Sequence, residues 1–213
     1  MNKYEREWNG VWARKNLLSH FVDRGRNVYN QIFTNLFRPY FLKNKIFLEV
    51  GCGTSSLLLK NARYFRKSYG LDISDEALKL SETNAKKMRV ENVRFIKGDC
   101  FKMPIKENSV DVVWSQGLIE HFENPLKIVT EHYRICQSGG VVLISTPAKY
   151  SYQHLWYKIT RPKMLRKFWP WTEQEFYNKK KYEKLLEGLN YDYEIFYLPK
   201  DISRAFIILK IKK

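Results

Sequence analysis

The sequence predicts an α/β fold in which a mostly parallel sheet is covered by helices on both faces. Between residues 46 and 146, short apolar segments alternate with amphipathic segments of helical period. The first apolar segment runs into glycines, and residues typical of helix caps stand at later boundaries. Because parallel strands are joined by crossovers, the connecting helices are expected to cover both faces of the sheet.

Five strands follow from this alternation. Ser74 is expected to cap the helix after the second strand, and Asn124, followed by Pro125, is expected to cap the helix before the fifth. Gly139 and Gly140 are expected to end that helix. The predicted strands are Ile46 to Val50, Ser68 to Asp72, Val93 to Ile96, Val110 to Trp114 and Val141 to Ser145.

Helices are expected on the N-terminal side of this region. Val28, Ile32 and Leu36 recur at helical spacing within residues 5–42, and Pro39 closes the pattern. These helices are expected either to cover the ligand site or to pack on the sheet edge.

The C-terminal flank departs from the α/β rhythm. Residues 148–171 combine aromatic side chains with Lys and Arg, and they follow a strand end, the side on which open α/β sheets bind ligands. We therefore interpret 148–171 as a substrate lid. Thr172 and Glu175 form a capping-box pattern for a helix that ends at Gly188. Two further strands are expected at about Tyr191 to Tyr197 and Ala205 to Ile211.

Length and composition indicate one domain spanning 1–213, with a helical cap at 1–44, a core at 45–147, the lid at 148–171 and a terminal helix and hairpin at 172–213. The three cysteines form no disulfide framework or zinc motif, the histidines show no metal-ligand spacing, and no signal peptide is evident, so we expect a cytoplasmic protein without a metal. The net charge of +16 favours an anionic partner, either nucleic acid or an acidic membrane surface. A Lys-rich solvated surface is the alternative.

The most informative segment is I-F-L-E-V-G-C-G, at residues 46–53. Gly51 and Gly53 have no side chain, so the backbone after the first strand can approach a ligand closely. A dinucleotide fingerprint needs a third glycine, but Ser56 stands at that position, and no P-loop motif is present. Glu49 disfavours a pyrophosphate and favours an ammonium, while Asp72 stands where a carboxylate meets ribose hydroxyls. A ligand with a ribose and a cationic end, and without phosphate, fits this pair.

The chain resembles class I S-adenosylmethionine (SAM) dependent methyltransferases of the small-molecule type. The motifs that carry the resemblance are F-L-E-V-G-C-G-T-S (47–55), Y-G-L-D-I-S (69–74), F-I-K-G-D-C-F-K-M-P (95–104), S-V-D-V-V-W-S-Q-G-L-I-E-H-F (109–122) and R-I-C-Q-S-G-G-V-V-L-I-S-T-P (134–147). The resemblance implies a Rossmann-like, seven-stranded sheet with a C-terminal antiparallel hairpin. The chain departs from the family pattern at Ser55, where a third glycine is frequent.

The resemblance also implies roles for individual residues. Asp72 is expected to bind the ribose diol, Asp99 to accept from the adenine amino group, and the Cys100 N–H to donate to a ring nitrogen. Glu49 has an alternative role as a cap or lysine partner, and Asp99 as a turn residue. The expected cofactor-binding residues are Glu49, Gly51, Cys52, Gly53, Asp72, Ile73, Asp99, Cys100, Ser115 and Gln116.

His121 is the candidate catalytic residue. It stands beside Glu120 next to the expected methyl path, where it is either a general base or a packing residue. Methyl transfer from a sulfonium depends mainly on alignment, so the reaction does not require a base.

The resemblance favours a methyltransferase with a small-molecule or lipid-like acceptor, and the aromatic lid is typical of an apolar pocket. RNA or protein methylation is the alternative favoured by the charge. The segment S-Q-G-L lacks the N/D-P-P-Y/F pattern of enzymes that methylate exocyclic base amines. A non-catalytic SAM-binding protein is a third possibility.

Overall fold

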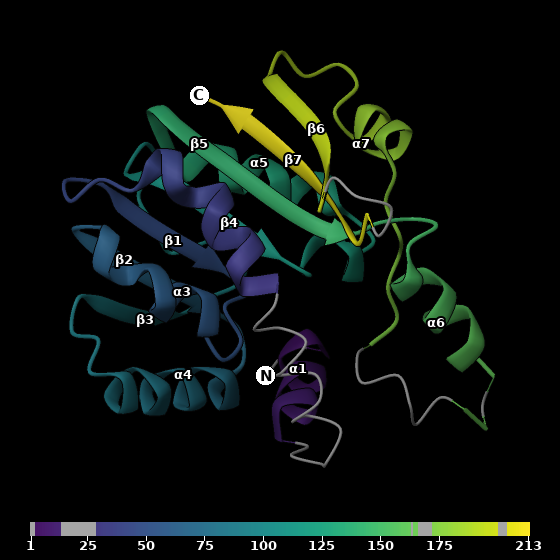
Figure 1. Cartoon of the computed structure of the whole chain (residues 1–213), viewed down its shortest axis with the longest axis horizontal. Helices are drawn as coiled ribbons and strands as arrows, with labels where there is room; N and C mark the ends of the chain where they lie inside the picture. Colours follow the sequence, from purple (N-terminus) through teal and green to yellow (C-terminus); the bar gives the residue numbers. More distant parts are fainter. Residues whose placement is uncertain (1–2, 14–28, 163, 166–171, 200–203) are drawn as a thin grey trace.

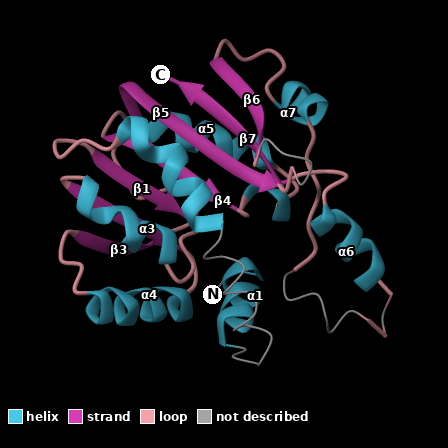
Figure 2. Cartoon of the chain, in the orientation of Figure 1, coloured by secondary structure: helices cyan, strands magenta, loops and turns pink. Residues whose placement is uncertain are grey.

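The computed structural model describes residues 3–13, 29–162, 164–165, 172–199 and 204–213, and these residues build one seven-stranded sheet with helices on both sides (Figures 1 and 2). The strand order is β3-β2-β1-β4-β5-β7-β6. The strands are β1 Ile46–Val50, β2 Lys67–Asp72, β3 Val93–Lys97, β4 Val110–Gln116, β5 Cys136–Pro147, β6 Asp192–Leu198 and β7 Phe206–Lys212. The helices are α1 Lys3–Ala13, α3 Ser56–Asn61, α4 Asp75–Met88, α5 Pro125–Ile135, α6 Tyr152–Thr160 and α7 Lys179–Leu185, with short 3-10 turns η1 Arg38–Tyr40, η2 Ala62–Tyr64 and η3 Ile119–His121.

The sheet confirms the predicted fold class. Strands β1 to β5 pair in parallel, whereas β7 pairs antiparallel with both β5 and β6. Strand β6 therefore runs in the direction of the first five, and β7 inserts between β5 and β6. This is the predicted Rossmann-like sheet with its C-terminal hairpin.

Alternate residues of each central strand enter two separate cores, as the period of a strand requires. Leu48 and Val113 pack in a core with α5 and α7 on one face of the sheet. Phe47 and Trp114 pack on the other face, against α3 and the helical residues 29–37. Burial of both faces explains why the central strands are almost continuously apolar.

Two helix starts agree with the sequence. The Ser74 hydroxyl accepts from the Ala77 N–H at 3.2 Å, and the Asn124 side chain accepts from the Lys127 N–H at 3.4 Å. Each cap satisfies an N–H that the helix itself leaves unpaired.

The predicted capping box of Thr172 and Glu175 is wrong. Helix α7 begins at Lys179, where the Asn178 side chain accepts from the Lys181 N–H at 2.8 Å. The Glu175 N–H instead donates to the Glu120 carbonyl at 2.9 Å. Residues 172–178 form no helix, because the Thr172 hydroxyl and the Glu175 N–H, which a capping box would use, make tertiary contacts instead.

The prediction that Gly139 and Gly140 end a helix is also wrong. Helix α5 ends at Ile135, and both glycines lie inside β5, where its register against β4 shifts. A Cβ on Gly140 would lie 2.8 Å from the Asp111 carbonyl oxygen. Glycine is needed there because two backbones approach closely.

The predicted N-terminal helices and lid are described in part. Residues 14–28, including Val28 of the N-terminal pattern, and residues 163 and 166–171 of the lid lie outside the described residues. Helix α1 contacts the sheet end through Glu5, whose carboxylate pairs with Lys97 at 2.8 Å. Among the described helices, none is long and apolar enough to cross a membrane.

Candidate functional site

A cavity of about 840 Å³ lies at the carboxyl ends of the central strands, with α1 and α6 at its rim (Figure 1). Strand β1 stands there between β2 and β4, the point at which open α/β sheets form a crevice. Its volume is in the range of about 300 to 1,000 Å³ typical of small-molecule sites. Nine of the ten predicted cofactor-binding residues line it: Glu49, Gly51, Cys52, Gly53, Asp72, Ile73, Asp99, Cys100 and Gln116.

The turn after β1 forms one wall of the cavity. Gly51 and Gly53 have φ angles of +68° and +52°, which residues with side chains rarely adopt. The Gly51 and Cys52 N–H groups both donate to the Leu71 carbonyl, at 2.8 and 3.1 Å. A Cβ on Gly53 would lie 2.6 Å from the Trp12 ring. The two glycines therefore provide a backbone wall that a larger residue would close.

Ser55 shows how the chain tolerates a departure from the family pattern. Its φ is +55°, in the left-handed region that favours glycine. The Ser55 hydroxyl contacts that of Ser81 at 2.8 Å, and Ser81 donates to the Gly53 carbonyl at 2.7 Å. These hydrogen bonds hold the turn in the conformation that a glycine would adopt more easily.

Asp72 ends β2 at the floor of the cavity. Its two carboxylate oxygens accept from the Gly53 and Ser74 N–H groups, each at 2.9 Å. Burial raises the pKa of Asp72, although these N–H groups act in the opposite direction. The side chain is thus fixed in orientation, and its remaining lone pairs face a site where hydroxyl donors of a ligand fit.

Asp99 and Cys100 lie in the loop after β3. The Asp99 side chain accepts from the Phe101 N–H at 2.9 Å, so it forms the turn that was the alternative to ligand binding. Asp99 also lines the cavity, so the two roles are compatible. Burial raises the pKa of the Cys100 thiol well above its usual range, which makes this thiol unreactive.

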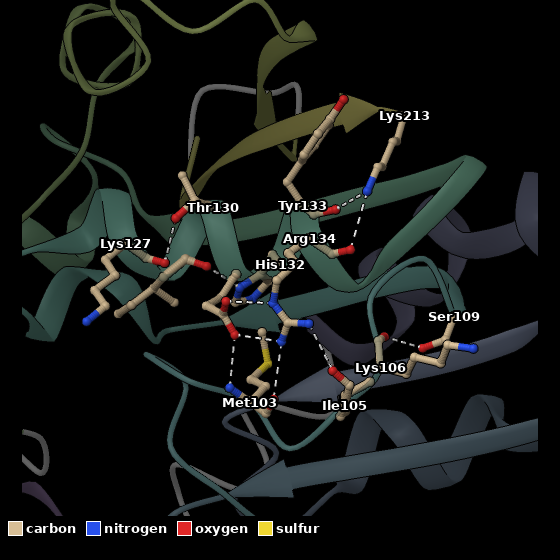
Figure 3. A network of polar contacts seen from close by, with 12 residues as sticks. Met103, Ile105, Lys106, Ser109, Lys127, Thr130, His132, Tyr133, Arg134 and Lys213 are labelled. Carbon is tan, nitrogen blue, oxygen red and sulfur yellow. Dashed lines mark hydrogen bonds and ion pairs between the residues drawn. The ribbon is translucent and has the colours of Figure 1, made fainter.

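Arg134 on α5 anchors this loop (Figure 3). Its guanidinium donates to the carbonyls of Ile105 and Met103 at 3.0 and 3.2 Å, and it pairs with Glu131. Glu131 in turn accepts from the Met103 N–H at 3.0 Å. No residue pattern in the sequence predicts this network, because Arg134 and Glu131 bind backbone groups of the loop.

Replacing Arg134 with methionine is expected to lower the free energy of unfolding by about 1 to 3 kcal/mol, since two carbonyls and the Glu131 carboxylate lose a charged donor. Amide hydrogen exchange in residues 98–105 should accelerate more than exchange in the central strands. The matched control is Arg94→Met, which changes an exposed arginine on β3. Equal exchange of this loop in both variants would contradict the anchoring role.

The two residues predicted at the end of β4 differ in position. Gln116 lines the cavity, whereas Ser115 is fully buried within the sheet, paired with Val50 of β1. A side-chain contact of Ser115 with a ligand is therefore not what this arrangement favours. The strand extends two residues beyond its predicted end at Trp114, which carries Gln116 to the cavity.

Glu120 is the most buried acid that lines the cavity, and it lies on the wall that η3 contributes. It is 3% exposed, lines the cavity, and its Oε2 has no hydrogen-bond partner among the described residues. Burial raises its pKa to about 8. A buried carboxyl with a vacant hydrogen-bonding position can bind a donor from a ligand or take up its proton.

His121 lines the same wall but is held by the protein. Its Nδ1 lies 2.9 Å from the Glu173 carbonyl oxygen and 2.9 Å from the Thr172 hydroxyl. Because a carbonyl oxygen can only accept, Nδ1 carries a hydrogen. The ring packs edge-on against Trp8 at 5.1 Å, and burial lowers the pKa of His121 to about 4. His121 therefore connects η3 to the extended segment after the lid and to α1.

Aromatic residues form the apolar part of the cavity. Most of them come from α1, from the helical residues 29–37 and from α6, elements that are distant in sequence. One follows η3 and one begins β7. The Tyr29 and Tyr152 hydroxyls hydrogen-bond to each other across two of these elements. The aromatic lining residues are Tyr4, Trp8, Trp12, Tyr29, Phe122, Tyr152, Trp156 and Phe206. The N-terminal residues Tyr4, Trp8 and Trp12 line the site, which agrees with the expectation that N-terminal helices cover it.

Residues 48–144 match the family described as methyltransferase domain. This segment of the chain is similar to a methyltransferase domain. The match begins in β1 and ends in β5, so it contains the glycine turn, Asp72, the loop after β3 and η3, and it leaves out α1 and α6.

Two known methyltransferases are similar in sequence to about half of this chain, and a solved structure is similar to nearly all of its fold. The chain is 29% identical over 121 residues to demethylmenaquinone methyltransferase of Geobacillus stearothermophilus, covering 54% of this chain and 52% of that enzyme. It is 33% identical over 104 residues to ajmaline N-methyltransferase of Rauvolfia serpentina, covering 48% and 36%. The chain thus spans about half the length, or less, of these relatives. Its fold superimposes on magnesium protoporphyrin IX methyltransferase from Synechocystis with a TM-score of 0.69 at 15% identity, covering 98% of this chain and 94% of that structure.

Proposed function

We propose that this chain is a SAM-dependent methyltransferase that acts on a small-molecule or lipid-like acceptor. The observation that carries the proposal is that one cavity is lined by the glycine turn, Asp72, the buried Glu120 and a set of aromatic side chains. The names of the relatives, which describe methyl transfer to a quinone precursor, an alkaloid and a porphyrin, support the same class of acceptor.

The residues of the first wall fit SAM. Gly51 and Gly53 present bare backbone to the cavity, where a Cβ would collide with Leu118 and Trp12, and the oriented Asp72 carboxylate suits a ribose diol. Glu49 is buried beside them and suits the ammonium of the methionine part, while Asp99 and the Cys100 N–H suit the adenine edge. When bound, SAM supplies a methyl group on a sulfonium, which is already activated for transfer.

The second wall fits the acceptor. Its aromatic rings exclude water and orient an apolar molecule, and orientation supplies much of the catalysis in such a transfer. Glu120 is the group placed to take a proton from an acceptor hydroxyl or amine, because it is buried and has a vacant oxygen. His121 positions this wall through its contact with Glu173.

Calorimetry tests the cofactor. SAM and its product S-adenosylhomocysteine are expected to bind, and NAD is not, since Ser56 replaces the third glycine of a dinucleotide site. Tight binding of NAD without heat from SAM would overturn the assignment.

Turnover tests the acceptor class. With radiolabelled SAM and a cell extract, we expect label in the organic-soluble and small polar fractions. Label confined to RNA and abolished by ribonuclease would make the chain an RNA methyltransferase. SAM binding without label in any fraction would make it a non-catalytic SAM-binding protein. The division into cap, core, lid and hairpin, and a cytoplasmic location, stay predictions.

A further inference from the structure

Helix α6 exposes an apolar stripe that a soluble helix would normally bury. Tyr152, Leu155, Trp156 and Ile159 follow the spacing i, i+3, i+4, i+7 of one helix face. Their exposed fractions are 50%, 60%, 48% and 48%. All four line the mouth of the cavity, so the stripe is continuous with the site.

The other side of α6 is attached to the protein. Thr160 is buried, and the rings of His154 and Tyr157 pack on Phe176 at 4.6 and 5.3 Å. The Ser151 side chain caps the helix by accepting from the His154 N–H at 3.3 Å. The helix is therefore attached by this side, and its apolar stripe stays exposed at the cavity.

The exposed apolar surface is concentrated in this region. Tyr150 and Met164 flank the helix and are 80% and 81% exposed. Six of the nine large hydrophobic side chains that are exposed among the described residues thus belong to one surface. We name this surface the α6 face: Tyr150, Tyr152, Leu155, Trp156, Ile159 and Met164.

The segment that carries the α6 face is rich in basic residues, although the exposed Glu173 carboxylate accepts a hydrogen bond from Tyr157 of α6. Residues 148–172 contain six Lys or Arg residues and no Asp or Glu. Of the described ones, Lys149, Lys158 and Arg161 are exposed. Exposed apolar and aromatic side chains beside basic ones are the pattern of helices that lie in the interface of an anionic membrane.

We propose that the α6 face docks on the surface of an anionic lipid bilayer, with the cavity mouth open toward the lipid. A second copy of the chain would bring two such basic surfaces together, which like-charge repulsion opposes. Single-stranded RNA would stack on the aromatic rings, but Leu155, Ile159 and Met164 offer no platform for bases and suit acyl chains. The proposal concerns binding and does not rest on the proposed function.

Vesicle flotation tests the proposal. We expect the chain to float with vesicles of phosphatidylcholine mixed with phosphatidylglycerol, and not with phosphatidylcholine alone. Raising the salt concentration should weaken binding, because the attraction between charges is screened. Since each basic residue near an anionic surface contributes about fivefold in affinity, loss of two of them weakens binding about 25-fold. The double variant Lys158→Glu/Arg161→Glu also introduces two repelling charges, so it should bind at least on the order of 25-fold more weakly. Tyr150→Ser/Met164→Ser should also bind several-fold more weakly.

Helix α4 offers matched controls. Lys86→Glu/Lys87→Glu makes the same change of charge, and Met88→Ser removes an apolar side chain that is 51% exposed. This helix lies beyond α1, far from α6 (Figure 1). The control variants are expected to bind like the parent chain, and the unfolding temperature of every variant shows that it is folded.

Three outcomes would overturn the proposal. The first is no flotation with anionic vesicles, and the second is equal loss of binding in the α6 and α4 variants, which would indicate a general effect of net charge. The third is tighter binding to a single-stranded RNA than to the vesicles, lost in the α6 variants, which would assign the α6 face to nucleic acid. Flotation requires no turnover, so its failure is distinct from a failure of the proposed methyl transfer.

Discussion

Replacing Asp72 with alanine is expected to weaken SAM binding by about 1.5 to 3 kcal/mol, because two charge-assisted hydrogen bonds to the ribose are lost. The carboxylate is oriented by the Gly53 and Ser74 N–H groups before any ligand arrives, so its contribution to binding carries little ordering cost. The dissociation constant from calorimetry measures the effect, which corresponds to about tenfold to a hundredfold.

Asp111→Ala is the matched control for this variant. Asp111 lies on β4 and also accepts from the backbone, at 2.8 Å from the Ile46 N–H, but it does not line the cavity. This control is expected to lower the unfolding temperature and to leave SAM affinity unchanged. A folded Asp72→Ala protein with the affinity of the parent would place the ribose elsewhere.

Replacing Glu120 with glutamine is expected to lower kcat by about 10²-fold or more for an acceptor that must lose a proton. Glutamine keeps the shape of the side chain but cannot take up that proton. Because the pKa of Glu120 is raised to about 8, kcat/KM of the parent enzyme should rise as the pH increases toward 8. The glutamine variant should lack this dependence.

Two controls separate catalysis from packing. Glu123→Gln changes an exposed neighbour and should leave kcat unchanged. His121→Ala removes the contacts with Glu173 and Trp8, so it should raise the KM for SAM and lower the unfolding temperature, with kcat within a few-fold of the parent. A large loss of kcat in His121→Ala, with stability and SAM affinity intact, would instead make His121 the base.

Glu120 also predicts a pH dependence of stability that needs no substrate. In the folded chain its carboxyl keeps a proton up to about pH 8, whereas the unfolded carboxyl ionises near 4.5. The folded state binds more protons between these values, so stability falls as the pH rises, by up to about 1.4 kcal/mol per pH unit. The pKa values of His121 and His132 are lowered to about 4, so these residues act in the opposite sense. The stability that they contribute to the folded state is lost as the pH falls from 6.5 toward 4.

The range from pH 6.5 to 8 is therefore free of opposition from these two histidines. Denaturant unfolding of the parent chain should show decreasing stability across this range, and Glu120→Gln should reduce that slope. Parallel slopes for the two proteins would show that Glu120 is ionised in the folded state.

Much of the fold was predictable because it depends on local patterns. The central strands β1, β4 and β5 are mostly buried on both faces, and such runs are apolar regardless of which helices cover them. Ser74 and Asn124 cap their own helices, so their role depends on residues three positions away. Gly51, Gly53 and Asp72 were predictable because the turn after β1 and the end of β2 lie side by side in any sheet of this order.

The errors arose where a local pattern competes with a distant partner. Thr172 and Glu175 satisfy a capping-box pattern, but the first contacts His121 and the second bonds to Glu120, so the helix begins only at Lys179, capped by Asn178. Gly139 and Gly140 resemble a helix end, but both lie inside β5, where Gly140 is required by the approach of β5 to β4 and Gly139 has a φ of +76°. No window of the sequence contains these partners.

The sequence by itself therefore determined the sheet, its glycine turn and the acid at the end of β2, since contacts within one βαβ unit require those residue types. Only the tertiary structure decided which distant side chains complete the cavity. Trp8, Trp12 and Trp156 line it together with Glu120. It also decided that the apolar stripe of α6 stays exposed at the cavity, because the spacing of such a stripe is the same whether a helix faces a core or solvent. The physical reason is that burial is a property of the assembled chain, and periodicity specifies a face without specifying what covers it.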